Sequence, residues 1–183
     1  MTGSSDLSTL DIHKISDDGR TVRIIPDDAQ RAEIAERLEL EGLTMLEADL
    51  RVVRDGPADS PRTGIFIEGD LKATGTQTCV VSLQPVPFEI STPFEGIALP
   101  ADSSEFEREE LTLEDDEVEL LGEITDSRVD LSEIVVQQLA LELDPFPRAE
   151  GAEPEWQNDQ DDEAEVQAES PFAALAKLKE TLK

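Results

Sequence analysis

The sequence is short of the residues from which most catalytic and metal sites are built. Its 183 residues include one cysteine, Cys79, one histidine, His13, one tryptophan and no tyrosine. A single cysteine cannot form a disulfide within the chain, and a structural zinc site needs four good ligands. No apolar run approaches the ~20 residues that cross a bilayer, and the first residues lack a signal-peptide pattern. We therefore expect a soluble, cytoplasmic protein without a metal or other cofactor.

Basic residues are also scarce. The chain has 15 Lys and Arg against 44 Asp and Glu, which gives a net charge of −29. Because nucleic-acid binding depends on Lys and Arg that displace counterions from phosphates, this surface should on average repel RNA and anionic lipid. Two interpretations of the acidic excess stay open: it keeps the chain soluble and monomeric, or it attracts a basic protein partner.

The acidic residues are concentrated in two segments. Residues 101–126 hold twelve acidic residues and one base, and residues 149–169 hold nine acidic residues and no base. The second segment has too few apolar side chains to offset the entropy cost of ordering it. The predicted organisation is a disordered start at 1–7, one domain at 8–148, a flexible linker at 149–169 and an amphipathic helix at 170–183.

Alternating apolar and charged residues dominate the first half of the domain. The pattern over 43–54 and 65–73 is typical of strands with one face in water. Shorter strands are predicted near 10–15, 22–25 and 117–121, and Phe88, Ile90 and Phe94 continue the alternation.

Two helices complete the predicted domain. The first spans about 26–41, with Pro26 in its first turn and Gly42 as terminator. The second spans about 131–143, where Asp130 and Glu133 form an approximate capping box. The resulting fold class is α+β: a mainly antiparallel sheet of five to seven strands with two packed helices.

Two short motifs stand out. Residues 79–86, Cys-Val-Val-Ser-Leu-Gln-Pro-Val, predict a buried strand that is stopped by Pro85. Its buried face would hold Cys79, Val81 and Leu83. Residues 144–148, Asp-Pro-Phe-Pro-Arg, predict a stiff, extended exit from the second helix. There, Phe146 either covers an edge of the core or, with Arg148, binds a partner.

In this order the two motifs resemble the YceD family, which is linked to accumulation of the large-subunit ribosomal RNA. That family often carries C-x-x-C-L-x-P-V; the chain carries the motif as Cys79, Ser82, Leu83, Pro85 and Val86. The resemblance spans roughly residues 8–148. The helix that begins at Ser170-Pro171-Phe172 is similar to branches that lack the second cysteine.

Cys79 has three possible interpretations. A small buried hydrophobe in a strand is favoured, because free cysteine is among the most buried residue types. Zinc binding is disfavoured because Ser82, a poor ligand, stands at the second position. A catalytic pair of Cys79 and His13 has no support in the local sequence.

The C-terminal segment is the other candidate for partner binding. Ser170 caps a short helix whose apolar stripe needs a surface to dock on, either on its own domain or on a partner. Membrane binding is disfavoured because the stripe is narrow and lacks Trp. The predicted contact residues are Phe172, Leu175, Leu178, Lys177 and Lys179.

Three functions follow from these observations. The resemblance implies a non-enzymatic factor in large ribosomal subunit biogenesis, which would bind a basic ribosomal protein or a precursor particle rather than RNA directly. The alternative is an acidic binding module unrelated to ribosomes, either a holder of a basic protein or a nucleic-acid mimic. An enzyme that uses Cys79 is the third. The first is favoured, and no motif supports catalysis.

Overall fold

The computed structural model describes residues 9–16, 18–56, 63–101 and 119–153. The chain divides into two units, residues 1–150 and 151–183, and the fold described below belongs to the first. The predicted disordered start at 1–7, the linker beyond residue 153 and the helix at 170–183 lie outside the described residues. No helix among the described residues is long and apolar enough to span a membrane.

A five-stranded sheet forms the centre of the first unit. Its strands lie in the order β2-β3-β4-β5-β6, in which β2 to β5 are antiparallel neighbours and β6 pairs parallel to β5. A separate two-stranded sheet pairs β1 with β7. The strands are β1 (Thr9–Asp11), β2 (Arg20–Ile24), β3 (Gly42–Asp55), β4 (Gly64–Thr78), β5 (Pro85–Pro100), β6 (Glu119–Ile124) and β7 (Arg128–Asp130).

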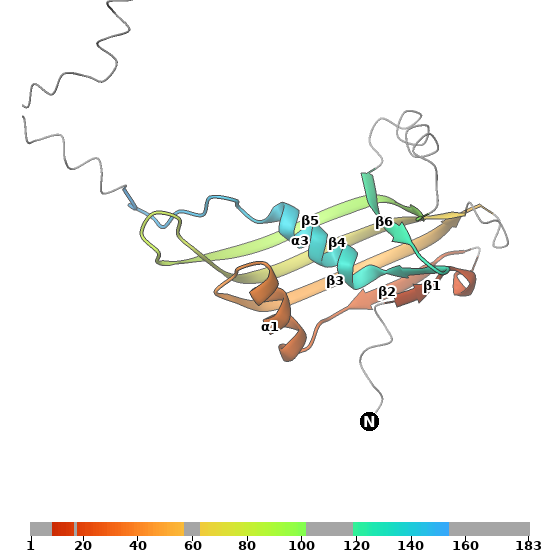
Figure 1. Ribbon diagram of the computed structural model, residues 1–183, viewed down its shortest axis with the longest axis horizontal. Helices are drawn as coiled ribbons and strands as arrows, with labels where there is room; N and C mark the ends of the chain where they lie inside the picture. The colour runs from red at the N-terminus through yellow and green to blue at the C-terminus, as the bar shows by residue number, and fades with distance from the viewer. Residues whose placement is uncertain (1–8, 17, 57–62, 102–118, 154–183) are drawn as a thin grey trace, which may run out of the picture. The chain divides into compact units, whose positions relative to one another are not determined.

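Two α-helices, α1 (Asp28–Arg37) and α3 (Leu131–Glu142), lie over the same face of the five-stranded sheet (Figure 1). Helix α1 packs against β3, and α3 packs against β4 and β1. The predicted α+β class, with a mainly antiparallel sheet and two packed helices, is confirmed. The first strand is shorter than predicted: it ends at Asp11, and the chain continues as a 3₁₀ turn, η1 (Ile12–Lys14).

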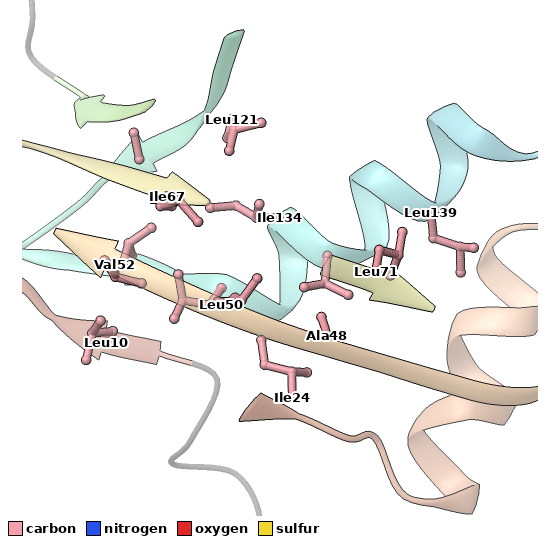
Figure 2. Close-up of a cluster of buried hydrophobic side chains, with 14 of the residues drawn as sticks. Leu10, Ile24, Ala48, Leu50, Val52, Ile67, Leu71, Leu121, Ile134 and Leu139 are labelled. Atoms are coloured by element: carbon pink, nitrogen blue, oxygen red, sulfur yellow. The ribbon is translucent and has the colours of Figure 1, made fainter. Parts of the chain in front are cut away.

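The core lies between this face and the helices. Alternate residues of β4 point toward the helices, and Ile65, Ile67, Leu71 and Ala73 are fully buried. From α3, Ile134 and Leu139 project into the same cluster (Figure 2). Truncating a buried Leu or Ile of this kind to Ala typically costs about 2–5 kcal/mol.

Helix α1 begins and ends differently from the prediction. Asp27 is its N-cap and forms a reciprocal capping box with Gln30, so Pro26 precedes the helix. At the other end the chain turns at Glu39, whose φ is +54°. The N–H of Leu40 then donates to Ala35, which closes a Schellman motif before the predicted terminator Gly42 is reached.

Helix α3 starts as predicted, but its capping is only half of a capping box. The Asp130 carboxylate accepts from the N–H groups of Ser132 and Glu133. The Glu133 carboxylate does not return to the cap; it accepts two hydrogen bonds from Arg37 of α1, at 2.6 and 2.5 Å. The Arg37 guanidinium lowers the pKa of Glu133, so this ion pair between the helices is lost when acid protonates the carboxylate.

One edge of the sheet is rich in proline. Three prolines of β5 occupy odd-numbered positions of the strand, and each pairs with a residue of β4: Pro85, Pro87 and Pro93. Residues at alternate positions direct their backbone N–H groups to the same side of a strand. Because proline has no N–H, its nitrogen must point away from β4 at each position. On that outer side β6 pairs only with Gly96–Pro100, and no described strand pairs with the rest of β5.

We predict that Gly75→Ala destabilises the fold. A Cβ on Gly75 would lie 2.5 Å from the Gly42 carbonyl oxygen and 2.7 Å from the Phe88 ring, so backbone must move. Overpacking of this kind typically costs about 1–3 kcal/mol, measurable by urea unfolding. The matched control is Gly42→Ala, whose Cβ would meet nothing within 4 Å. Equal stability of the two variants would contradict this account of the packing.

Candidate functional site

Residues 79–84 form a closed turn that joins β4 to β5. The Cys79 N–H donates to the Gln84 carbonyl at 2.8 Å, and the Leu83 N–H donates to the Cys79 carbonyl at 3.1 Å. The predicted strand through this segment is therefore wrong. Cys79 is buried, but Leu83 is 75% exposed, and Pro85 begins β5 instead of stopping a strand. The next motif residue, Val86, is partly buried and pairs with Gln77 of β4.

The Cys79 sulfur connects this turn to the segment that follows α3. Cys79 is fully buried, and its Sγ accepts backbone N–H groups of Val81 at 3.4 Å, Ser82 at 3.3 Å and Ala149 at 3.3 Å. Ala149 is distant in sequence, so the sulfur ties two separate segments together. Its burial agrees with the prediction, but the side chain acts as a hydrogen-bond acceptor as well as a packing group.

These donors change the acidity of the thiol. They lower the pKa of Cys79 to about 6, with the Ala149 N–H as the largest cause, followed by the hydroxyl and the N–H of Ser82. Burial acts in the opposite direction, because it disfavours the charged form. The turn therefore favours a thiolate at neutral pH, held where solvent does not reach it.

The recorded hydrogen-bond partners of the Cys79 sulfur are backbone groups, not the ligands of a metal site or a catalytic histidine. The hydrogen-bond donors around Sγ that the structure records belong to Val81, Ser82 and Ala149, while His13 is exposed in η1. Within the described residues, no group of three His, Cys, Asp or Glu side chains is placed to hold a metal ion. A buried sulfur cannot reach a substrate as a nucleophile unless the turn opens.

The segment after α3 is fixed against the turn by its backbone. The Val80 N–H donates to the Pro147 carbonyl at 2.9 Å, and the Gln77 side chain donates to the Asp144 carbonyl at 2.9 Å. The Asp144 carboxylate accepts from the Phe146 N–H. Pro147 is buried between these contacts.

The Phe146 side chain points to solvent. It is 70% exposed. The interpretation in which Phe146 covers an edge of the core is therefore wrong. Arg148 is also exposed. Its role in binding a partner, like that of Phe146, stays a prediction. The other predicted contact residues, Phe172, Leu175, Leu178, Lys177 and Lys179, lie outside the described residues.

Three exposed apolar side chains thus project from two hydrogen-bonded segments. We call Val80, Leu83 and Phe146 the turn patch; their exposed fractions are 48%, 75% and 70%. The sequence identified Leu83 and Phe146 as motif or partner residues, but it did not place them on adjoining segments. Both motifs can be recognised in the sequence, but only the fold shows that they lie on adjoining segments.

A second surface feature was not predicted. On the sheet face opposite the helices, a shallow hollow of about 660 Å³ crosses β2 to β5. Across neighbouring strands, Asp49 lies opposite Asp70 and Glu68 lies opposite Glu95. Like charges directly opposite one another destabilise a sheet. Sequence alternation marks each of these residues as solvent-facing, but only the strand register reveals which of them face one another.

Residues 67–179, more than half of the chain, match the family described as large ribosomal RNA subunit accumulation protein YceD. The chain belongs to the YceD family. The match begins in β4, includes both the Cys79 turn and the segment after α3, and extends past the expected end at residue 148. No curated protein and no solved structure matches the chain. Membership of the YceD family implies a role in the accumulation of large-subunit ribosomal RNA.

We predict that the Cys79 thiol makes stability depend on pH. Because its pKa falls from the ordinary value of 9.0 to about 6 on folding, the unfolded chain holds the proton between these values. The melting temperature should therefore gain a Cys79-dependent increase from pH 6 to pH 9, which is lost as the pH falls through 6. Cys79→Ser, which does not ionise in this range, should remove that increase.

The same thiol can be titrated directly. Cys79 is the only cysteine and the chain has no tyrosine, so ultraviolet absorbance reports its thiolate without overlap from a phenolate. A titration midpoint near 9 in the folded protein would contradict the hydrogen-bonded thiolate.

Proposed function

We propose that this protein is a non-enzymatic factor in large ribosomal subunit biogenesis that works in the cytoplasm. It would support accumulation of the large-subunit RNA by binding a basic ribosomal protein or a precursor particle. The observation that carries this proposal is the family match over residues 67–179. The net charge of the chain and the position of Cys79 indicate which kind of partner it binds and that binding is its role.

Charge argues for a protein partner over naked RNA. The chain has a net charge of −29, and phosphate contacts require Lys or Arg. The described surface is also rich in acidic residues: four carboxylates line the hollow in the sheet, and Arg51 is the cationic side chain among its lining residues. Ribosomal precursor particles offer basic proteins to which such a surface is attracted.

A non-enzymatic role is supported by the position of Cys79. Its sulfur is buried and occupied with three backbone N–H groups. A nucleophilic cysteine needs access to its substrate, which the buried sulfur of Cys79 lacks. The contacts of Cys79 instead match a structural role, in which the sulfur holds the turn to the segment after α3.

A second candidate function is an acidic module that holds a basic protein or mimics a nucleic acid, without any link to ribosomes. The pairs Asp49–Asp70 and Glu68–Glu95 favour it, because they gather carboxylates on one sheet face, where, among the described residues, Arg23 and Arg51 form ion pairs with only two of the four. Depletion of the protein separates the two functions. A biogenesis factor changes the ratio of precursor to mature large-subunit RNA, whereas an unrelated acidic module leaves it unchanged.

We predict that the protein co-sediments with large-subunit precursor particles at low salt and is released at high salt. Exposed charges lose most of their attraction beyond the Debye length, which is ~10 Å at 0.1 M salt and ~3 Å at 1 M. The measurement is the bound fraction across sucrose gradients at the two salt concentrations, with protein-free ribosomal RNA as control. A protein that stays unbound in every gradient, or that binds the naked RNA tightly, would refute the proposal.

A further inference from the structure

We infer that the turn patch is where the partner docks, and that the contacting part of this partner is a Lys- or Arg-rich protein segment carrying an apolar side chain. This inference rests on the proposed function, since it names the surface and the chemistry of the same binding event.

Exposure is the first observation. Six large hydrophobic side chains of the described residues are exposed, and three of them form the turn patch. The other three, Ile25, Leu120 and Leu141, belong to different elements: the loop before α1, strand β6 and helix α3. Single exposed apolar residues are ordinary, but three of them on two segments that are joined by hydrogen bonds are a candidate interaction site.

The second observation is that hydrogen bonds fix the backbone segments that carry the patch. The buried Cys79 sulfur accepts N–H groups from both segments, and the Val80 N–H donates to Pro147. The neighbouring Phe146 is positioned by the bond from its N–H to the Asp144 carboxylate. Side chains on a preorganised backbone lose less entropy on binding, which is the property of an anchor residue.

The third observation is the backbone of Leu83. Its φ is +58°, in the left-handed region that favours glycine and asparagine and is costly for a branched aliphatic residue. Burial does not compensate this cost, because the Leu83 side chain is 75% exposed. A leucine in this position is explained if the side chain has a use outside the fold.

Charge identifies the occupant. Glu142, Asp144 and Glu150 are exposed in and beside the segment that carries Phe146, against one cation, Arg148. An apolar patch with this rim is complementary to a basic segment with an apolar anchor. Addition of a partner strand to the neighbouring β5 edge is disfavoured, because Pro85, Pro87 and Pro93 remove outward-facing donors. The contact is therefore made by side chains.

The test uses two variants and a control in the full-length chain. Leu83→Gly removes the exposed side chain and relieves the left-handed strain, so the melting temperature should stay the same or rise. Phe146→Ser removes a side chain that is 70% exposed and should leave stability unchanged. The control is Ile25→Ser, which removes a 56% exposed apolar side chain in the loop before α1.

The probe is the large-subunit precursor particle, purified from cells that lack the protein. We expect Leu83→Gly and Phe146→Ser each to weaken binding about 10-fold or more at low salt, as hot-spot residues do. Ile25→Ser should bind as the unmodified protein does. A loss of affinity in Leu83→Gly without a loss of stability separates a binding role from a folding role.

The outcomes distinguish this inference from the proposed function. If the unmodified protein does not bind the particle, both fail. If it binds and the two patch variants bind equally well, only the inference fails. The inference is also overturned if the patch variants lose affinity for protein-free ribosomal RNA instead, or if light scattering shows a dimer that Leu83→Gly dissociates.

Discussion

Burial of one face of β4 is the constraint on which the rest of the first unit depends. Its alternate residues Ile65, Ile67 and Leu71 are fully buried, and α3 covers them with Ile134 and Leu139. Because β4 is the central strand, its register with β3 and β5 sets most of the sheet. The opposite face can then hold facing carboxylates, because the apolar core offsets their repulsion and Arg23 and Arg51 form ion pairs with Asp49 and Glu68.

The Cys79 turn extends from this framework. The turn follows the last residue of β4, and the Cys79 sulfur holds the segment that leaves α3. The positions of β4 and α3 therefore determine where the turn patch lies. The family motif residues thereby divide into two kinds. Cys79 supports the turn from inside, whereas Leu83 is strained and exposed and adds nothing visible to the core.

Much of the fold could be predicted, because strand alternation and helix caps are local signals. The strand over 43–54 and the helix that begins after Asp130 lie where the sequence indicates, within a few residues. The turn at 79–84 could not be recognised: its alternating apolar residues fit a strand equally well, and no glycine or asparagine marks the left-handed position that Leu83 occupies. The end of α1 was misplaced for the same reason, because Glu39 takes the conformation expected of Gly42.

The candidate site was less predictable because its parts meet only through the tertiary structure. Sequence reasoning selected Cys79, Leu83 and Phe146 separately, but the bond from the Ala149 N–H to Sγ joins residues 70 apart. The β5 edge has its own consequence. A chain with so long a strand at the margin of its sheet would ordinarily be at risk of stacking with its copies into fibres. The prolines there lack the outward N–H groups that such growth would need, which makes polymerisation along this part of β5 unfavourable.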